Sequence, residues 1–210
     1  KEVDRDDIRN RPVVPEDRLG TYATSPLHQH IQHYRLYHKG SYTQGKGELT
    51  TLTGLQQNIR REYNHPTATM QAGLNVLLNT LNYEVTYSLP EWQGIHFSCG
   101  INGMYQENKN RDATDFPIPD YHLFDIGAYL LAKKEYNKIV ITCGIRLDNR
   151  SINWNNFYTR REAASGFVKQ VHFPDTTGTT LSFPAYKQHF SGLSGSLGLV
   201  YNISNALTLK

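Results

Sequence analysis

The chain has 210 residues, of which 38% are hydrophobic and 20% charged, and it lacks any run of about 18 apolar residues that could form a transmembrane helix. Its 22 Lys and Arg against 19 Asp and Glu are mixed along the chain, which excludes the basic footprint of a nucleic-acid-binding protein. Two cysteines, Cys99 and Cys143, are too few for a disulfide framework, whereas 16 Gly and 14 Tyr favour strands and turns over helices.

Both ends of the chain indicate a piece of a longer protein. It opens with the polar run KEVDRDDIRNRP and closes on LTLK, an alternating pattern that has only begun. We therefore expect residues 1–29 to form a loop and residues 30–210 to hold strands and their connections.

Alternation of apolar and polar residues predicts a series of strands. Most exceed the roughly 5–6 residues usual in soluble sheets and reach the roughly 9–11 that a tilted strand needs to cross a bilayer. In chain order the predicted strands are 30–44, 48–63, 73–88, 95–106, 121–134, 138–150 and 190–202, with a stub at 206–210.

The connections between these strands alternate in length. The short ones are 45–47, 89–94, 135–137 and 203–205. The long ones are 64–72, 107–120 and 151–189, besides the leading segment 1–29. Short turns on one side and long loops on the other are typical of a barrel that crosses a membrane repeatedly. We therefore predict an all-β fold, namely an antiparallel up-and-down transmembrane β-barrel segment of about seven to eight strands.

In four segments, 95–105, 121–132, 138–148 and 193–201, one face carries no charged side chain. In 138–148 that face carries Ile139, Ile141, Cys143, Ile145 and Leu147, and in 190–202 it carries Leu193, Leu197, Leu199 and Tyr201. Lipid accounts for this exclusion, so we expect these residues to point outwards, and Arg146 and Asp148 to face the lumen. A soluble barrel or sandwich with ordinary amphipathic strands is the alternative, because its alternation looks the same.

Six blocks of the sequence carry a specific resemblance. They are GELTTLTGLQQNIRREYNHP (47–66), GLNVLLNTLNYEVTY (73–87), GINGMYQENKN (100–110), FPIPDYHLFDIGAYLLAKKEY (116–136), GIRLDNR (144–150) and FSGLSGSLGLVYNIS (190–204). In this order they resemble TonB-dependent outer-membrane receptors of the Bacteroidetes type, and the resemblance covers roughly residues 26–210.

The resemblance implies a transport protein in the outer membrane of a Gram-negative bacterium. Such receptors close a barrel of about 22 strands with a plug domain and import scarce ligands, such as an iron chelate (a ferric siderophore), haem, another metal complex or a glycan. The chain is expected to be part of that barrel, without the plug domain. Its partners would then be the imported ligand, the outer-membrane lipid and, through the missing plug region, TonB. No cofactor is expected. The alternative is a β-barrel module that binds a ligand or glycan without transport.

Histidines and one arginine near the predicted loop side are candidates for ligand binding. His28 and His30 share a strand face, and with His65 from the next long loop they could hold zinc or haem at the outer mouth. They could equally be hydrogen-bonding groups of a wet rim, and the metal remains unknown. Arg60 could clamp a carboxylate or phosphate of a chelate. Its alternative role is a structural charge that pairs with lumenal carboxylates.

The long loop 151–189 supplies aromatic candidates. Trp154, Phe157 and Tyr158 could stack on a sugar, a haem or an aromatic chelator, or could pack on one another to shape the loop. No catalytic residue is predicted, because the chain contains no GxSxG or HExxH motif, and the pair His189 and Ser191 has only strand spacing in its favour. We therefore expect a protein that is not an enzyme.

Overall fold

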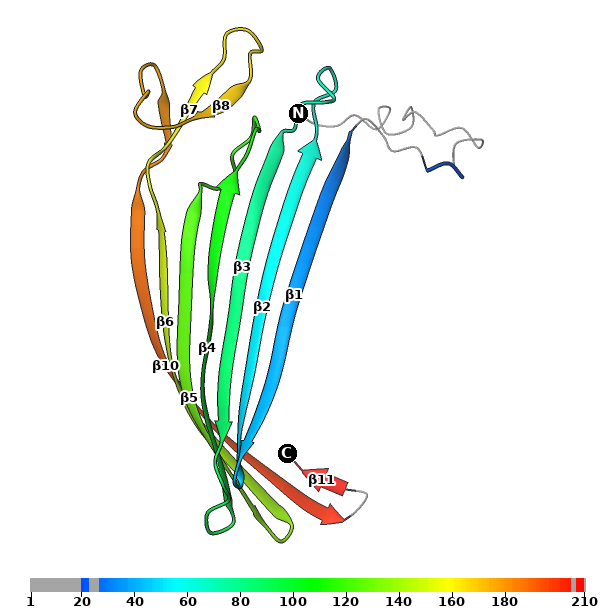
Figure 1. Ribbon diagram of the computed structural model, residues 1–210, viewed down its shortest axis with the longest axis vertical. Coiled ribbons are helices and arrows are strands. Elements are labelled where there is room, and N and C mark those ends of the chain that lie inside the picture. Colours follow the sequence, from blue (N-terminus) through cyan, green and yellow to red (C-terminus); the bar gives the residue numbers. More distant parts are fainter. Residues whose placement is uncertain (1–19, 23–26, 205–206, 210) are drawn as a thin grey trace.

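The computed structural model describes residues 20–22, 27–204 and 207–209, and its regular elements there are β-strands (Figure 1). No helix in this part of the chain is long and apolar enough to span a membrane. The strands are β1 (His28–Gln44), β2 (Gly47–Tyr63), β3 (Leu74–Ser88), β4 (Ile95–Asn110), β5 (Tyr121–Tyr136), β6 (Ile139–Trp154), β7 (Phe157–Arg161), β8 (Val168–Val171), β9 (Thr180–Phe183), β10 (Tyr186–Ser204) and β11 (Leu207–Leu209).

Eight strands form one antiparallel, up-and-down sheet. Their order is β1-β2-β3-β4-β5-β6-β10-β11, so each strand pairs with its neighbour in the sequence except where β7–β9 leave the sheet between β6 and β10. The sheet is long, tilted and curved into an open trough (Figure 1). The predicted all-β, up-and-down topology is confirmed.

The long loop 151–189 was predicted wrongly in its extent and its structure. β6 continues to Trp154 and β10 begins at Tyr186, and the two strands pair along this extension. Between them, β8, β7 and β9 form a separate three-stranded sheet. The strand ends escaped prediction because the alternation changes sides there: Ile152, Trp154 and Tyr186 lie on the concave face, whereas the apolar residues of the rest of both strands lie mainly on the convex face.

The register sorts the side chains of the large sheet onto two faces. Residues directly opposite each other on antiparallel strands project to the same side. One row therefore runs through Tyr42, Leu49, Tyr87, Cys99, Leu130 and Ile145. The neighbouring row runs through Ser41, Thr50, Thr86, Gly100, Tyr129 and Arg146. The first row belongs to the apolar face and the second to the polar face.

The apolar face is left uncovered by the described chain. Leu147 is 60% exposed, Leu193 68% and Leu197 81%. The few buried hydrophobic side chains lie mainly around the loops, as Ala72, Ala113 and Phe157 do. Both cysteines are free, and they lie on this apolar face on β4 and β6, with β5 between them.

The two ends of the predicted series lie partly outside the described residues. Residues 1–19 and 23–26 of the predicted loop 1–29 are not described, and neither are residues 205–206 and 210. In the predicted stub, Leu207–Leu209 forms β11 against β10.

Candidate functional site

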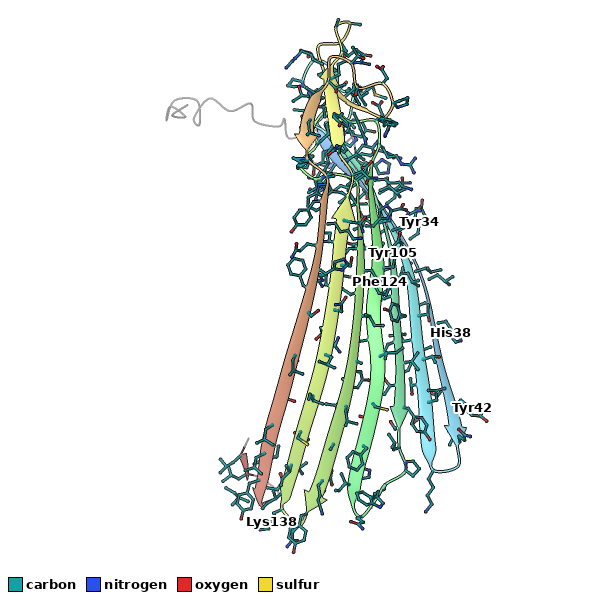
Figure 2. All side chains as sticks on the ribbon, turned by 90° about the vertical axis from the view of Figure 1, so that its left-hand side faces the viewer. Tyr34, His38, Tyr42, Tyr105, Phe124 and Lys138 are labelled. Carbon is teal, nitrogen blue, oxygen red and sulfur yellow. The ribbon has the colours of Figure 1, made fainter. Side chains whose placement is uncertain are left out.

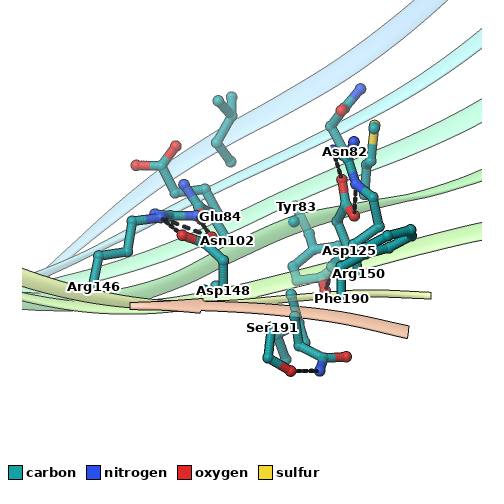
Figure 3. Close-up of a pocket in the computed structure, with 17 residues that line it drawn as sticks. Asn82, Tyr83, Glu84, Asn102, Asp125, Arg146, Asp148, Arg150, Phe190 and Ser191 are labelled. Atoms are coloured by element: carbon teal, nitrogen blue, oxygen red, sulfur yellow. Dashed lines mark hydrogen bonds and ion pairs between the residues drawn. The ribbon is translucent and has the colours of Figure 1, made fainter. Parts of the chain in front are cut away.

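A groove of about 790 Å³ lies on the polar face of the sheet (Figure 3). Its lining includes Leu52 on β2 and Phe190 on β10, which are separated by four strands in the sheet. One groove can touch strands so far apart only if the sheet curves around it, so the polar face is the concave face. The apolar face, with Leu147 and Leu197, is therefore convex.

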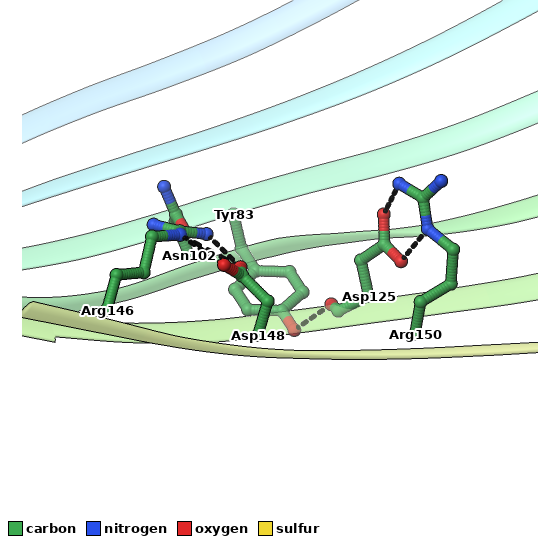
Figure 4. Close-up of polar contacts among 6 residues, drawn as sticks. All are labelled: Tyr83, Asn102, Asp125, Arg146, Asp148 and Arg150. Atoms are coloured by element: carbon green, nitrogen blue, oxygen red, sulfur yellow. Dashed lines mark hydrogen bonds and ion pairs between the residues drawn. The ribbon is translucent and has the colours of Figure 1, made fainter. Parts of the chain in front are cut away.

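Arg146 and Asp148 lie in this groove, as their strand parity predicted (Figure 4). Arg146 Nε donates to both carboxylate oxygens of Asp148 at 2.8 and 2.9 Å, and Arg146 Nη2 donates to Asn102 Oδ1 at 2.8 Å. The side chains reach from β6 to β4 across Gly127 on β5, where a Cβ atom would overlap the Arg146 guanidinium. Gly127 therefore permits this contact.

A second ion pair lies along the same groove. Arg150 Nε and Nη2 donate to the two oxygens of Asp125 at 2.6 and 2.7 Å, a bidentate arrangement. Behind it, the Tyr83 hydroxyl on the convex side donates to the Asp125 backbone carbonyl at 2.7 Å across Gly103. We call Glu84, Asn102, Asp125, Arg146, Asp148 and Arg150 the charged ladder.

The ladder continues into a chain of hydroxyl groups. Tyr129 crosses Gly100 so that its hydroxyl lies 2.6 Å from Thr86 Oγ1, and Thr86 donates to Glu84 at 3.2 Å. These groups are partly exposed, and they satisfy one another by ion pairs and hydrogen bonds. Such a surface favours contact with water, polar solutes or another polar surface, because packing it dry against apolar groups would cost several kcal/mol.

Charge is distributed differently on the two faces. In β1–β6 and β10 the concave face carries the basic residues Arg35, Lys39, Arg60, Lys133, Arg146 and Arg150, and the acidic residues Glu48, Glu62, Glu84, Asp125, Glu135 and Asp148. Four of these basic residues form ion pairs with acidic partners on the same face. The convex face of the same strands carries Arg61, Lys109, Lys134 and Lys187 against Glu107 alone.

The long loops gather at one end of the trough and hold one another. From β8, Lys169 Nζ contacts Gln71 Oε1 at 2.8 Å and Asp112 Oδ1 at 2.6 Å, so one side chain joins three loop regions. Gln170 donates to Asp120 at 2.9 Å. We call residues 64–73, 111–120 and 155–185 the outer cap.

Two of the predicted site residues are bound into the outer cap. His65 Nε2 lies 2.6 Å from Thr114 Oγ1, and its ring packs on Phe167 at 4.6 Å. Phe157 is only 4% exposed and packs between Phe116 and Phe183. The three-stranded sheet thus encloses Phe157, which corresponds to the alternative that the loop aromatics pack on one another.

The remaining aromatic candidates lie where the cap meets the sheet. Trp154 stacks on Tyr186 at 4.5 Å and donates from Nε1 to the Pro184 carbonyl at 2.9 Å. The Tyr158 hydroxyl accepts from Asn156 at 3.2 Å. Packing of the loop aromatics on one another is thus the arrangement that the structure shows, and ligand contact by Trp154 and Tyr158 stays a prediction.

The histidine candidates do not converge. His28 and His30 share the convex face with Tyr34 and point away from the groove, and His28 stacks on Tyr63 at 4.7 Å. Across the described ranges, no group of three His, Cys, Asp or Glu side chains is placed to hold a metal ion. The structure therefore does not bring His28, His30 and His65 together as one metal-holding group, and ligand binding by them stays a prediction. A side chain on the convex side of a curved sheet cannot line its concave mouth.

Arg60 does lie on the concave face, as its parity predicted, where it pairs with Glu62. Arg150 and Lys169 make contacts that were not predicted from the sequence. Arg150 shares the parity of Arg146 and Asp148, which could have identified it. Lys169 carries no local signal, because its partners lie 57 and 98 residues away.

Comparisons with known proteins concern the fold. No protein-family model matches the chain, and no curated protein sequence matches it either. Among solved structures, the ferric yersiniabactin uptake receptor FyuA from Yersinia pestis is similar with a TM-score of 0.52 and 15% identity, over 84% of this chain and 26% of the receptor. The copper transporter OprC gives a TM-score of 0.46 and 13% identity, over 83% of this chain and 28% of the transporter.

The chain thus spans about a quarter of the length of the receptor whose fold it shares. The similarity covers most of this chain, whose described residues lie mainly in long antiparallel strands. The chain therefore shares the fold of a stretch of this uptake receptor.

Proposed function

We propose that the chain forms part of the wall of an outer-membrane receptor of a Gram-negative bacterium, which imports a scarce ligand such as an iron chelate, haem or another metal complex with energy from TonB. The observation that carries this proposal is the division of one sheet into two faces. The concave face is polar with balanced, paired charges, and the convex face exposes leucine and isoleucine side chains without cover. Lipid around the convex face and a polar barrel interior along the concave face would suit both faces at once.

The outer cap supports a role in receiving the ligand. It lies at the end of the trough opposite the short turns, and its loops form one hydrogen-bonded body (Figure 1). The stacked Trp154 and Tyr186 project to the concave side at its base. Arg60, paired with Glu62, lies at the same end. We assign the plug, and with it the contact to TonB, to a part of the protein outside these 210 residues.

The test uses the full-length protein in its host. A strain without the gene is grown on limiting iron, and uptake of radiolabelled iron is measured from a panel of chelates and from haem, with and without an uncoupler of the proton gradient. The proposal predicts energy-dependent uptake of at least one ligand that returns on complementation. Binding that occurs without any energy-dependent uptake would favour the ligand- or glycan-binding module.

A deletion separates the cap from the wall. Removing residues 157–183, the small sheet β7–β9, should abolish uptake yet leave the barrel in the outer membrane, because surface loops tolerate large changes in length. The matched control replaces the short turn 89–94, at the opposite end, by a different six-residue turn. Uptake at the parental rate after the cap deletion would remove β7–β9 from the ligand path.

A further inference from the structure

The convex face changes character near the outer cap. Its apolar band ends at aromatic side chains, of which Tyr34 on β1, Tyr105 on β4 and Phe124 on β5 are 56%, 41% and 41% exposed (Figure 2). Tyr105 and Phe124 are direct cross-strand partners. Exposed aromatic rings at the edge of an apolar band mark the level where hydrocarbon gives way to headgroups.

Basic and imidazole side chains lie beside and beyond these rings on the same face. We call Arg61, Lys109, His122, Lys187 and His189 the basic belt. His189 lies in the cross-strand row of Tyr105 and Phe124, and His122 and Lys187 lie in the next row towards the outer cap. In the register, His122 on β5 and Lys187 on β10 are both opposite Asn153 on β6, and Lys109 lies two residues beyond Glu107, the partner of His122. Strands lie about 4.8 Å apart, so the part of the belt from Lys109 on β4 to Lys187 on β10 spans about 15 Å.

Most of the belt's charge is not neutralised by the chain. Lys109 pairs with Glu107 at 2.8 Å, and His122 Nδ1 lies 2.9 Å from the Tyr105 hydroxyl. Lys187 and His189 are exposed, and neither has an ion-pair or hydrogen-bond partner among the described residues. Glu107 is the one acidic side chain on the convex face of β1–β6 and β10, whereas on the concave face of the same strands six acidic side chains balance six basic ones.

We propose that the basic belt binds the phosphate groups of lipid headgroups in the leaflet that surrounds the outer end of the barrel. The inference rests on the proposed function, because it needs lipid around the convex face. Two observations support the inference: the belt carries more positive than negative charge, and the belt lies at the border of the apolar band. A headgroup whose acyl chains lie on the leucines below would bring its phosphate to this level. Lysine is a frequent phosphate ligand, and each basic residue near an anionic lipid surface strengthens binding about fivefold.

The test measures lipid binding to the purified full-length protein by native mass spectrometry. The probe is dioleoyl phosphatidic acid, and the reference is dioleoylglycerol, which has the same chains without phosphate. The double variant Lys109→Gln with Lys187→Gln should weaken phosphatidic acid binding by about 10- to 25-fold and leave dioleoylglycerol binding unchanged. Lys134→Gln, on the same face near the short turns, should change it by less than about twofold.

A second variant is expected to change lipid binding in the opposite direction, so that weaker binding caused by unfolding can be distinguished from the loss of a phosphate contact. Glu107→Gln removes the belt's acidic residue and should tighten phosphatidic acid binding by about fivefold. Unchanged binding in both this variant and the lysine double variant would overturn the proposal. Equal weakening by Lys134→Gln would do the same. Displacement of the lipid by millimolar inorganic phosphate would assign the belt to free anions and would also refute it.

Uptake by the same variants keeps the two proposals apart. The lysine double variant should still import the ligand of the parental receptor, because the belt faces away from the groove. Normal uptake without any phosphate-dependent lipid binding refutes the belt and leaves the receptor function standing. Phosphate-dependent lipid binding by a parental protein that imports nothing refutes the receptor function instead.

Discussion

The concave and convex faces belong to the same strands, yet the concave face is rich in charged side chains and the convex face in apolar ones. On the concave face, Arg146 with Asp148 and Arg150 with Asp125 form ion pairs that line an open groove. On the convex face, Leu147, Leu193 and Leu197 stand exposed without partners. A soluble sheet would bury the apolar face and expose the charged one. Here the charged face lines the concave side of the curved sheet and the apolar face lies outside, a reversal that the lipid surroundings of the proposed function would explain.

The size of the uncovered face sharpens the contrast. Apolar patches on monomeric soluble proteins rarely exceed a few hundred Å². The exposed apolar side chains of the convex face lie on β1, β2, β4, β5, β6 and β10. Water would penalise such a surface, and lipid would not.

The largest expected effect comes from a charge on the convex face. Leu147→Arg, in the middle of the apolar band, should lower the free energy of unfolding by about 2–4 kcal/mol, the cost of an arginine in the lipid-facing wall of a barrel. Ser196→Arg, on the concave face of β10, should cost less than about 1 kcal/mol. Urea unfolding of the full-length protein in phosphatidylcholine vesicles measures both. Equal losses would erase the distinction between the two faces.

The next effect comes from filling the space that Arg146 uses. Gly127→Val would place a side chain against the guanidinium and should cost about 1–3 kcal/mol through the displaced contacts to Asp148 and Asn102. Gly192, also on the concave face, has no atom within 4 Å of an added Cβ, so Gly192→Val is the matched control. Its stability should stay near that of the parent in the same urea titration. A loss as large for Gly192→Val would contradict the assigned role of Gly127.

A smaller effect is expected from the hydrogen bond that links the faces. Tyr83→Phe removes the hydroxyl that donates to the Asp125 carbonyl and should cost about 1 kcal/mol. Tyr87→Phe is the control, because the hydroxyl of Tyr87 has no hydrogen bond within the described ranges. Thermal unfolding followed by the shift in electrophoretic mobility measures the difference. Identical midpoints for the two variants would show that this bond adds no net stability.

The smallest effect is expected within the charged ladder. In a double-mutant cycle of Asp125→Ala and Arg150→Ala, the coupling energy should be about 0.5 kcal/mol, because Arg150 is 53% exposed and water screens the pair. High salt should reduce this coupling further. A coupling of several kcal/mol would mean that the groove excludes water, as it would under a tightly packed plug.

Much of the wall could be predicted because its information is local. A strand with lipid on one side must repeat apolar residues with a period of two, and that period appears directly in Ile139, Ile141, Ile145 and their neighbours. The alternation of short and long connections then permits only neighbour pairing, which the observed order confirms. The sequence also placed Arg146 and Asp148 on the opposite face from the leucines.

The outer cap was settled only by the tertiary structure. Neither the three-stranded sheet around Phe157 nor the contacts of Lys169 follow a local pattern, because they join loops far apart in the chain. The same holds for His28 and His30, whose shared face was predicted but whose side of the wall was not. Alternation tells which residues share a face, whereas the direction in which the sheet curves decides which face lines the groove. By itself the sequence determined the strands and the sorting of their faces, because both depend on residues that are near neighbours in the chain. The tertiary structure decided the groove, the outer cap and the basic belt, because each depends on strands and loops that meet only in the folded protein.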